Sequence, residues 1–313
     1  MAAFGIHISK QTPFGDYKTL EDAIDSIVSK YDFNAYQMFT HGPQSRSKNK
    51  YDVGMISSLN KATAFVHSTY STDGYWGAVD DDIKLNSKVT KAKLQSYFKH
   101  IQDQLNATNE ICGAGFIIHI TRKPITILEA GMKLLHDNIK QPLNVKIILE
   151  FRAMKPSPDS SYETPKQINE LASALRPIKL NWGFCLDTSH MWATGVPMGD
   201  PNIVNKWFDN ITCGDKIALF HLNASSNDTF GKGKDVHIIP FAQHDDMWGQ
   251  LTKAKKYDDL SNKDYTLIKR SALGFLLLWA KKNKVPIIGE FKRGTVTELQ
   301  FAIDVIQSIL ENN

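Results

Sequence analysis

Nine side chains of the types that bind metal ions lie at the ends of short apolar segments of this chain or in the loops that follow them. Ile-Ile-Leu is followed by Glu150, for example, and Phe-Cys-Leu is followed by Asp187, with His190 three residues further on. The nine are His67, His119, Glu150, Asp187, His190, His221, Asp235, His237 and Glu290. Imidazole and carboxylate groups without a thiolate form a donor set that suits zinc or manganese.

A single polar residue at the end of a strand is more often a group with a local hydrogen-bond partner than a metal ligand. Six successive apolar segments that all end in a ligand-type residue are much harder to explain in this way. Other histidines show the contrast. His100 and His136 lie within helical patterns and are expected at the surface or at the edge of the core, while His7 and His41 lack the pattern of the nine.

The segments that carry these side chains are rich in β-branched and aromatic residues, which is typical of strands. We predict strands at residues 4–8, 35–39, 64–67, 115–119, 146–150, 182–187, 217–221 and 286–290. Amphipathic segments between them predict helices at residues 20–31, 94–105, 125–139, 164–175, 265–281 and 295–310. Thr164, Pro165 and Gln167 form a capping box at the start of one helix, and Thr19 with Asp22 is a weaker version.

Strands that alternate with helices predict a single (β/α)₈ TIM barrel over residues 1–313, because no linker divides the chain. In such a barrel all the strands end at one rim, so the nine side chains converge there although they are scattered through the sequence. The long polar connection at residues 223–263 is then expected to be an elaborated loop on the same rim.

The composition permits this fold and narrows the class of protein. The 313 residues are 42% hydrophobic and 22% charged, which is close to globular averages. No apolar stretch reaches the roughly 20 residues that span a bilayer, and no secretion signal is evident, so we expect an intracellular protein, whether in the cytoplasm, the nucleus or a viral factory or virion. Three widely spaced cysteines argue against a disulfide framework.

The net charge of +4 permits an anionic partner without identifying one. Local basic clusters, such as the one at residues 46–50, are candidates for phosphate contacts, although most such clusters are only solvated surface.

Several of the segments resemble the motifs of the endonuclease IV family of AP endonucleases, including versions carried by large DNA viruses. The most specific is Cys185-Leu-Asp187-Thr188-Ser-His190. The others are His67-Ser-Thr-Tyr70, His221-Leu-Asn223, Asp235-Val-His237 and Glu290, together with Gly5-Ile-His7-Ile-Ser9 and Gln37-Met-Phe39-Thr40 near the start. The resemblance covers nearly the whole chain.

The resemblance implies a centre of three Zn²⁺ ions, with Mn²⁺ as an alternative at one site. It assigns the nine residues as follows: His67, His119 and Glu150 to the first site, Glu150, Asp187, His221 and Glu290 to the second, and His190, Asp235 and His237 to the third. Glu150 and Glu290 are the implied catalytic residues. Glu150 suits bridging because a carboxylate has two oxygens to share, and Glu290 would orient the nucleophile.

The implied activity is hydrolysis of the phosphodiester bond 5′ to an abasic site in duplex DNA, which leaves a 3′-hydroxyl, with trimming of blocked 3′ ends as a second activity. An abasic nucleotide is cheaper to extrude from the duplex than a paired one, which makes selection by flipping physically reasonable. We expect a monomer without an obligate protein partner.

The expected DNA contacts are Tyr70, Gln44, Arg46 and Asn223, and here the chain departs from the family pattern. Gln44 stands where an arginine that enters the DNA is common, and Arg46 could replace it. Other departures are Thr69 before the tyrosine, Ala224 in place of an aspartate, and Val236 in place of an arginine. None of them falls on an expected metal ligand.

Two alternatives remain open at this stage. A metal-dependent sugar isomerase or epimerase of the same barrel superfamily would also place ligands at strand ends, but around one metal or a close pair. A catalytically silent protein that binds damaged DNA would have an incomplete set of ligands, whereas this set is complete. The number of metal ions per chain separates the first alternative from the nuclease.

Overall fold

Eight parallel strands close into a barrel in the computed structural model, which describes residues 2–12, 15–44, 46–58, 62–140, 144–156, 162, 164–249 and 251–311. The order around the barrel is β1-β10-β9-β8-β7-β6-β5-β4. The strands are β1 (Phe4–His7), β4 (Ala35–Met38), β5 (Thr63–His67), β6 (Gly115–Ile120), β7 (Lys146–Phe151), β8 (Trp182–Asp187), β9 (Ile217–Leu222) and β10 (Ile287–Gly289). The predicted (β/α)₈ TIM barrel is confirmed.

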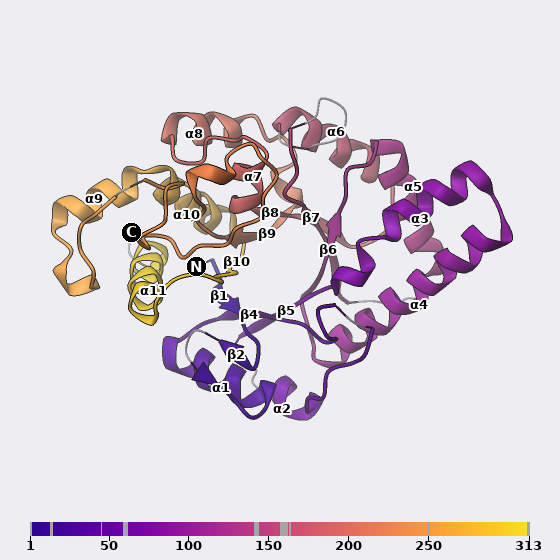
Figure 1. The fold of residues 1–313 in the computed structure, drawn as a ribbon, viewed down its shortest axis with the longest axis horizontal. Helices are drawn as coiled ribbons and strands as arrows, with labels where there is room; N and C mark the ends of the chain where they lie inside the picture. Colours follow the sequence, from indigo (N-terminus) through magenta and orange to yellow (C-terminus); the bar gives the residue numbers. More distant parts are fainter. Residues whose placement is uncertain are drawn as a thin grey trace.

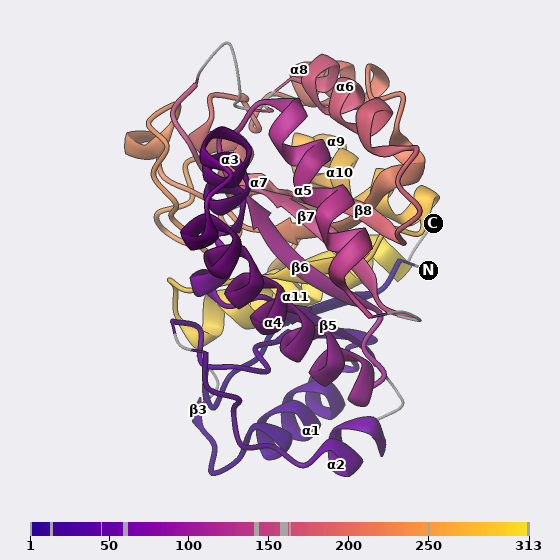
Figure 2. The ribbon, with the colours of Figure 1, turned by 90° about the vertical axis from the view of Figure 1, so that its right-hand side faces the viewer.

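Helices surround the strands (Figure 1). They are α1 (Leu20–Tyr31), α2 (Val53–Ser58), α3 (Tyr75–Leu85), α4 (Lys88–Glu110), α5 (Ile125–Asn138), α6 (Pro165–Leu175), α7 (Thr188–Ala193), α8 (Pro201–Asp209), α9 (Asn262–Arg270), α10 (Ala272–Asn283) and α11 (Val296–Glu311). Figure 2 shows that α3, α4 and α5 cover the side of the barrel formed by β6. A short hairpin, β2 (Gln11–Thr12) with β3 (Gly15–Asp16), follows β1.

The eight predicted strands are all present, and their ends differ from the prediction by at most one residue. The capping box at Thr164 is confirmed: its side chain accepts from the Gln167 amide, and the Gln167 side chain accepts from the Thr164 amide. The single helix predicted at residues 265–281 is wrong, because two helices, α9 and α10, meet at Ser271. The Ser271 backbone is extended and its hydroxyl accepts from the Gly274 amide, so this residue caps a new helix.

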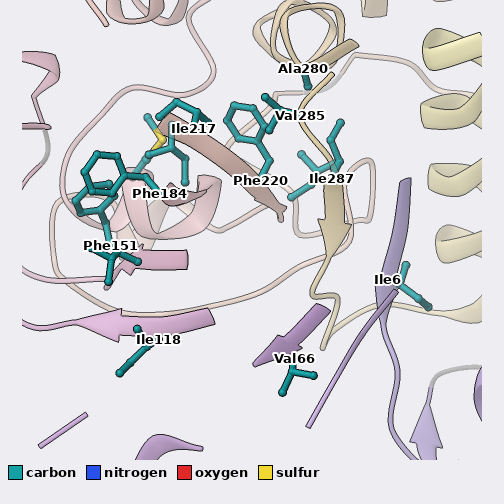
Figure 3. Packing of buried hydrophobic residues seen from close by; sticks show 14 of the residues in the cluster. Ile6, Val66, Ile118, Phe151, Phe184, Ile217, Phe220, Ala280, Val285 and Ile287 are labelled. Carbon is teal, nitrogen blue, oxygen red and sulfur yellow. The ribbon is translucent and has the colours of Figure 1, made fainter. Parts of the chain in front are cut away.

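The strands separate two apolar cores. Inside the barrel lies a small layer of buried residues, Ala35, Phe65, Ile117, Ile148, Cys185, Leu219 and Ile288. The alternate strand residues point outward into a much larger core shared with the helices, and Figure 3 shows part of it, including Val66, Phe184 and Phe220. On β1 the corresponding position is Gly5. A Cβ at this position would lie 1.7 Å from the Ala35 carbonyl oxygen. Only glycine fits this closely paired position.

The connection between β9 and α9 contains only short 3-10 turns among its described residues. It is anchored by the bridge of Ile238 to Ala224 and by that of Ile238 to Arg293. Across the described residues, every helix is too short or too polar to cross a membrane.

Candidate metal centre

All eight strands present a polar side chain toward the barrel axis at or directly after their carboxyl ends. Since side chains alternate along a strand, the residue two positions beyond each member of the inner apolar layer faces the same way. These residues are His7, Gln37, His67, His119, Glu150, Asp187, His221 and Glu290. Six of the eight are predicted ligands, and the structure brings them together at one rim, each no more than 9% exposed.

The first expected group forms around one oxygen of Glu150. His67 Nε2 lies 3.1 Å and His119 Nε2 lies 3.5 Å from Glu150 Oε2. The three residues are close enough together to share one metal ion.

The second group forms around the other oxygen of the same carboxylate. His221 Nδ1 lies 3.2 Å from Glu150 Oε1, 3.7 Å from Glu290 Oε2 and 3.8 Å from Asp187 Oδ2. These four residues also form a cluster with the spacing of a metal site. The two oxygens of Glu150 therefore face two different ligand groups, which is the geometry that a bridging carboxylate requires.

The third group lies on α7 and on the connection after β9. Asp235 Oδ1 is 2.6 Å from His237 Nε2 and 3.5 Å from His190 Nε2. Asp187 Oδ2 lies 3.7 Å from His237 Nε2, so Asp187 stands between the second and third groups. Asp187 also caps α7 by accepting from the His190 amide, and this cap directs His190 toward the centre.

The five candidate histidines share a further feature: one ring nitrogen of each lies against a hydrogen-bond acceptor, and the other faces carboxylates. The acceptors are the carbonyl oxygens of Ser68 for His67 (2.7 Å), Phe151 for His190 (2.8 Å) and Glu290 for His237 (3.2 Å), the Asp73 carboxylate for His119 (3.2 Å) and the Gln37 amide for His221 (2.8 Å). Metal-binding histidines have this arrangement because the outer contact fixes the tautomer and the ring orientation.

Several buried atoms of the centre lack a hydrogen-bond partner among the described residues. They include Glu150 Oε1, His221 Nδ1 and His237 Nε2. A buried polar atom without a partner costs about 1–3 kcal/mol, so such groups normally have one. Cations bound by these atoms would satisfy them, and the residues present therefore fit the metal centre that the resemblance implies.

Cys185 also lies close to Glu150 and His221. Burial raises the pKa of its thiol to about 12, so the sulfur is protonated at neutral pH. Without a metal ion, a neutral thiol therefore lies beside the imidazole and carboxylate groups of the centre.

The carboxylates and imidazoles of the cluster shift one another's pKa values in favour of their charged forms. Burial raises the pKa of Glu150, but the neighbouring His221 and His119 outweigh burial and hold it well below the usual range. Burial likewise opposes the charge on His119, yet Glu150 and Asp73 raise its pKa to about 9. The pKa of His190 rises to about 10 because Asp187 and Asp235 outweigh its burial.

Zinc binding is expected to release protons at pH 7.5. In the metal-free chain His119 and His190 have pKa values of about 9 and 10 and are protonated at this pH, whereas zinc binds the neutral imidazole. We expect the release of at least about two protons per chain and weaker zinc binding as the pH falls. Calorimetric titration with zinc in buffers of different ionisation enthalpy measures the number of protons that are released. A heat that is the same in all buffers would contradict this expectation.

The four expected DNA contacts lie in different surroundings. Tyr70 is 37% exposed and its ring stacks on that of His119, with the centroids 5.9 Å apart. Arg46 is exposed but turns toward α4, where it donates to Ser96. Gln44 is exposed in the loop after β4.

The structure argues against Asn223 as a DNA contact, because its side chain is fully buried and its Nδ2 donates to Asp187 Oδ2 at 2.9 Å. Asn223 therefore supports a candidate ligand. Of the neighbouring departures, Ala224 is fully buried, whereas Val236 is half-buried and its carbonyl accepts from Ser189.

Gln37 and His7 fall in motifs quoted above but were given no role at the centre, and Asp73 was not singled out. Gln37 and His7 each lie two positions beyond an inner-layer residue of their strand, Ala35 and Gly5, as the ligands on the other strands do. The alternation of side chains along a strand could therefore have identified them. Asp73 lies in the loop after β5, accepts from Arg152 at 2.8 Å and contacts His119. No sequence pattern singles it out.

A cavity of about 530 Å³ opens beside the centre. Its lining includes His7, Phe39, Tyr70, Glu290 and Lys292. Burial opposes the charge on Lys292, but Glu290 and Tyr70 outweigh it and raise the pKa of this amine. The cavity therefore combines aromatic faces, a cation and a candidate ligand.

No family model matches the chain, but curated relatives do. The protein named "Probable AP endonuclease" of African swine fever virus is 25% identical over 285 residues, which cover 87% of this chain and 84% of that protein. "Probable endonuclease 4" of Malacoplasma penetrans is 25% identical over 243 residues, which cover 71% and 77%. The resemblance to the endonuclease IV family and to a viral version of it is confirmed, and the names of these relatives give the expected enzyme class.

Solved structures show the same fold. The structure of AsfvAP:AG has a TM-score of 0.75 at 23% identity and 99% coverage of both chains. Endonuclease IV from Thermus thermophilus has a TM-score of 0.64 at 15% identity, with 99% of this chain and 100% of that chain covered. A D-tagatose 3-epimerase-like protein has a TM-score of 0.58 at 14% identity, with 99% and 97% covered, so the fold alone does not separate the nuclease from the sugar enzymes.

Proposed function

We propose that this chain is a zinc-dependent DNA-repair endonuclease that hydrolyses the phosphodiester bond 5′ to abasic sites in duplex DNA and leaves a 3′-hydroxyl. Trimming of blocked 3′ ends at the same centre is part of the proposal. The observation that carries it is the cluster of five histidines and four carboxylates, in which each histidine has its outer nitrogen against an acceptor. The resemblance to the AP endonucleases supplies the substrate.

The nine residues would hold three zinc ions in the groups described above. Zinc bound there supplies Lewis acidity, which lowers the pKa of water toward 7 and neutralises the charge that develops on the phosphate. Manganese is an alternative at one site, since its preferred carboxylate ligands are present.

The protein's own groups have distinct parts in this chemistry. Glu150 joins the first two groups through its two oxygens. Glu290 belongs to the second group and also lines the cavity, so it is placed to accept a hydrogen bond from the attacking water and orient it. Tyr70 and Lys292 line the same cavity, where an aromatic face can pack on a sugar and an ammonium can bind a phosphate.

A nicking assay tests the proposal. The substrate is a labelled duplex with one tetrahydrofuran abasic analogue, and the undamaged duplex is the control. We expect a single nick 5′ to the analogue with a 3′-hydroxyl product, loss of activity with a chelator, and recovery when zinc is added. A zinc-loaded chain that leaves the duplex intact would refute the nuclease.

The sugar isomerase or epimerase is the second candidate, because the barrel is shared. The third group, His190, Asp235 and His237, favours the nuclease, since an isomerase centre is built around one metal or a close pair. About three zinc ions per chain with no turnover of ketohexoses is the expected result. One or two ions together with epimerisation of a ketohexose would reverse the assignment.

The affinity for abasic duplex DNA is expected to fall at least about tenfold between 50 and 200 mM salt, because each phosphate contact releases counterions. Fluorescence anisotropy measures this affinity with the metal-loaded chain and a labelled abasic duplex that cannot be cleaved, so that the DNA stays intact during the titration. An affinity that is flat across this range would argue against phosphate contacts.

We further propose that the chain acts inside cells or in a virion, as a monomer and without an obligate protein partner.

A further inference from the structure

Gln37 is a fully buried amide on β4, at the same rim as the candidate ligands. Its Nε2 donates to Glu290 Oε1 at 2.5 Å and lies 3.0 Å from His7 Nδ1. Its Oε1 lies 2.8 Å from His221 Nε2. An ionised carboxylate can only accept hydrogen bonds, so the NH₂ group must face Glu290 and the oxygen must face His221.

This orientation determines the tautomer of His221. Because Gln37 Oε1 can only accept, His221 Nε2 must carry the proton of the neutral imidazole, the form that binds metal, and Nδ1 then has the lone pair. That lone pair faces Glu150 at 3.2 Å, and Glu290 and Asp187 lie within 3.8 Å. The other four candidate histidines have the opposite arrangement, with Nδ1 against an outer acceptor and Nε2 toward the carboxylates of the centre.

A buried glutamine is usually a structural group whose amide bonds to backbone or to neighbouring side chains. Gln104 is such a residue: it is fully buried on α4, accepts from the Thr69 amide and contacts His100, and it touches none of the nine candidate ligands. Gln37 differs because two of its three partners are candidate ligands of one metal group, and because those ligands come from β9 and from the end of β10.

We propose that Gln37 is a positioning residue of the second metal site, which holds His221 in the tautomer that binds through Nδ1 and fixes the Glu290 carboxylate beside it. The proposal rests on the metal centre of the proposed function. Loss of an outer hydrogen-bond partner of a metal ligand typically weakens metal binding 10- to 100-fold. Gln37 serves two ligands, so we expect an effect toward the upper end of that range.

The test compares Gln37→Met with Gln104→Met in the full-length, zinc-loaded chain. Both changes replace a fully buried amide by an apolar side chain of similar length. After equilibration with a graded chelator, Gln37→Met should retain about two zinc ions where the wild type retains about three, with the weakest site bound up to about 100-fold less tightly. Gln104→Met should unfold at a lower temperature but keep the wild-type zinc content.

A second measurement tests the tautomer in the wild type, without the need for a folded variant. Long-range ¹H–¹⁵N correlation spectra of the zinc-loaded wild type report which nitrogen of each histidine binds metal. We expect His221 to be the histidine that is bound through Nδ1, and Gln37→Met to lose the Nε2–H signal of this ring. Binding of His221 through Nε2 in the wild type would overturn the proposal.

Unchanged zinc affinity and an unchanged His221 spectrum in Gln37→Met would also overturn it. If the wild type nevertheless binds three zinc ions and nicks abasic DNA, this result refutes the role of Gln37 but not the proposed function. A wild-type chain that binds no zinc would refute both the proposed function and the role of Gln37.

Discussion

Replacing Glu150 by glutamine is expected to lower the rate of cleavage at an abasic site by about 10⁴-fold or more. The two oxygens of Glu150 face two ligand groups, one with His67 and His119 and the other with His221. An amide nitrogen cannot bind a metal ion, so one change weakens two sites. Each 1.36 kcal/mol of lost transition-state stabilisation costs a factor of about ten, and a bound metal ion supplies several kcal/mol.

Single-turnover nicking with excess enzyme measures this rate, and elemental analysis of the same samples gives the zinc content, which should fall to about one ion per chain. Glu21→Gln is a matched control, because Glu21 is only 4% exposed and lies on α1 away from the candidate ligands. The control should cleave at the wild-type rate. A Glu150→Gln chain that keeps its metal ions and its full rate would refute the bridging role.

The second large effect is expected from Asp235→Asn, which removes the carboxylate of the third group. Asp235 Oδ1 lies 2.6 Å from His237 Nε2 and is close to His190. We expect the zinc content to fall from about three ions to about two and the cleavage rate to fall about 10²- to 10³-fold, the typical cost of losing one stabiliser of transition-state charge. The effect should be on kcat more than on KM, since the variant keeps the cavity that holds DNA.

Asp228→Asn is the control for this change. Asp228 is an exposed carboxylate on the same connection after β9, where it contacts Ser226 and Lys234. The substitution should leave both zinc content and rate unchanged. If Asp235→Asn bound only two zinc ions and still cleaved at the wild-type rate, the third group would have no part in catalysis and the case against a two-metal sugar enzyme would weaken.

The sequence by itself was sufficient for the barrel and for the approximate position of the centre. Strand ends can be predicted because side-chain alternation and apolar segments are local properties, and all parallel strands of a barrel end at one rim. The split between α9 and α10 was missed because Ser271 is neither a proline nor a glycine. Its capping role depends on the backbone conformation that it adopts between two packed helices.

The tertiary structure alone decided which atoms of the centre face one another. Gln37 meets Glu290 and His221 across 253 and 184 residues of sequence, and no local pattern encodes such a contact. Asn223 stands directly after a ligand segment and was expected to touch DNA, but it is turned inward to bind Asp187. Residue types fix what chemistry a side chain can perform, whereas its direction, its tautomer and its outer partners depend on strands that meet only when the barrel closes.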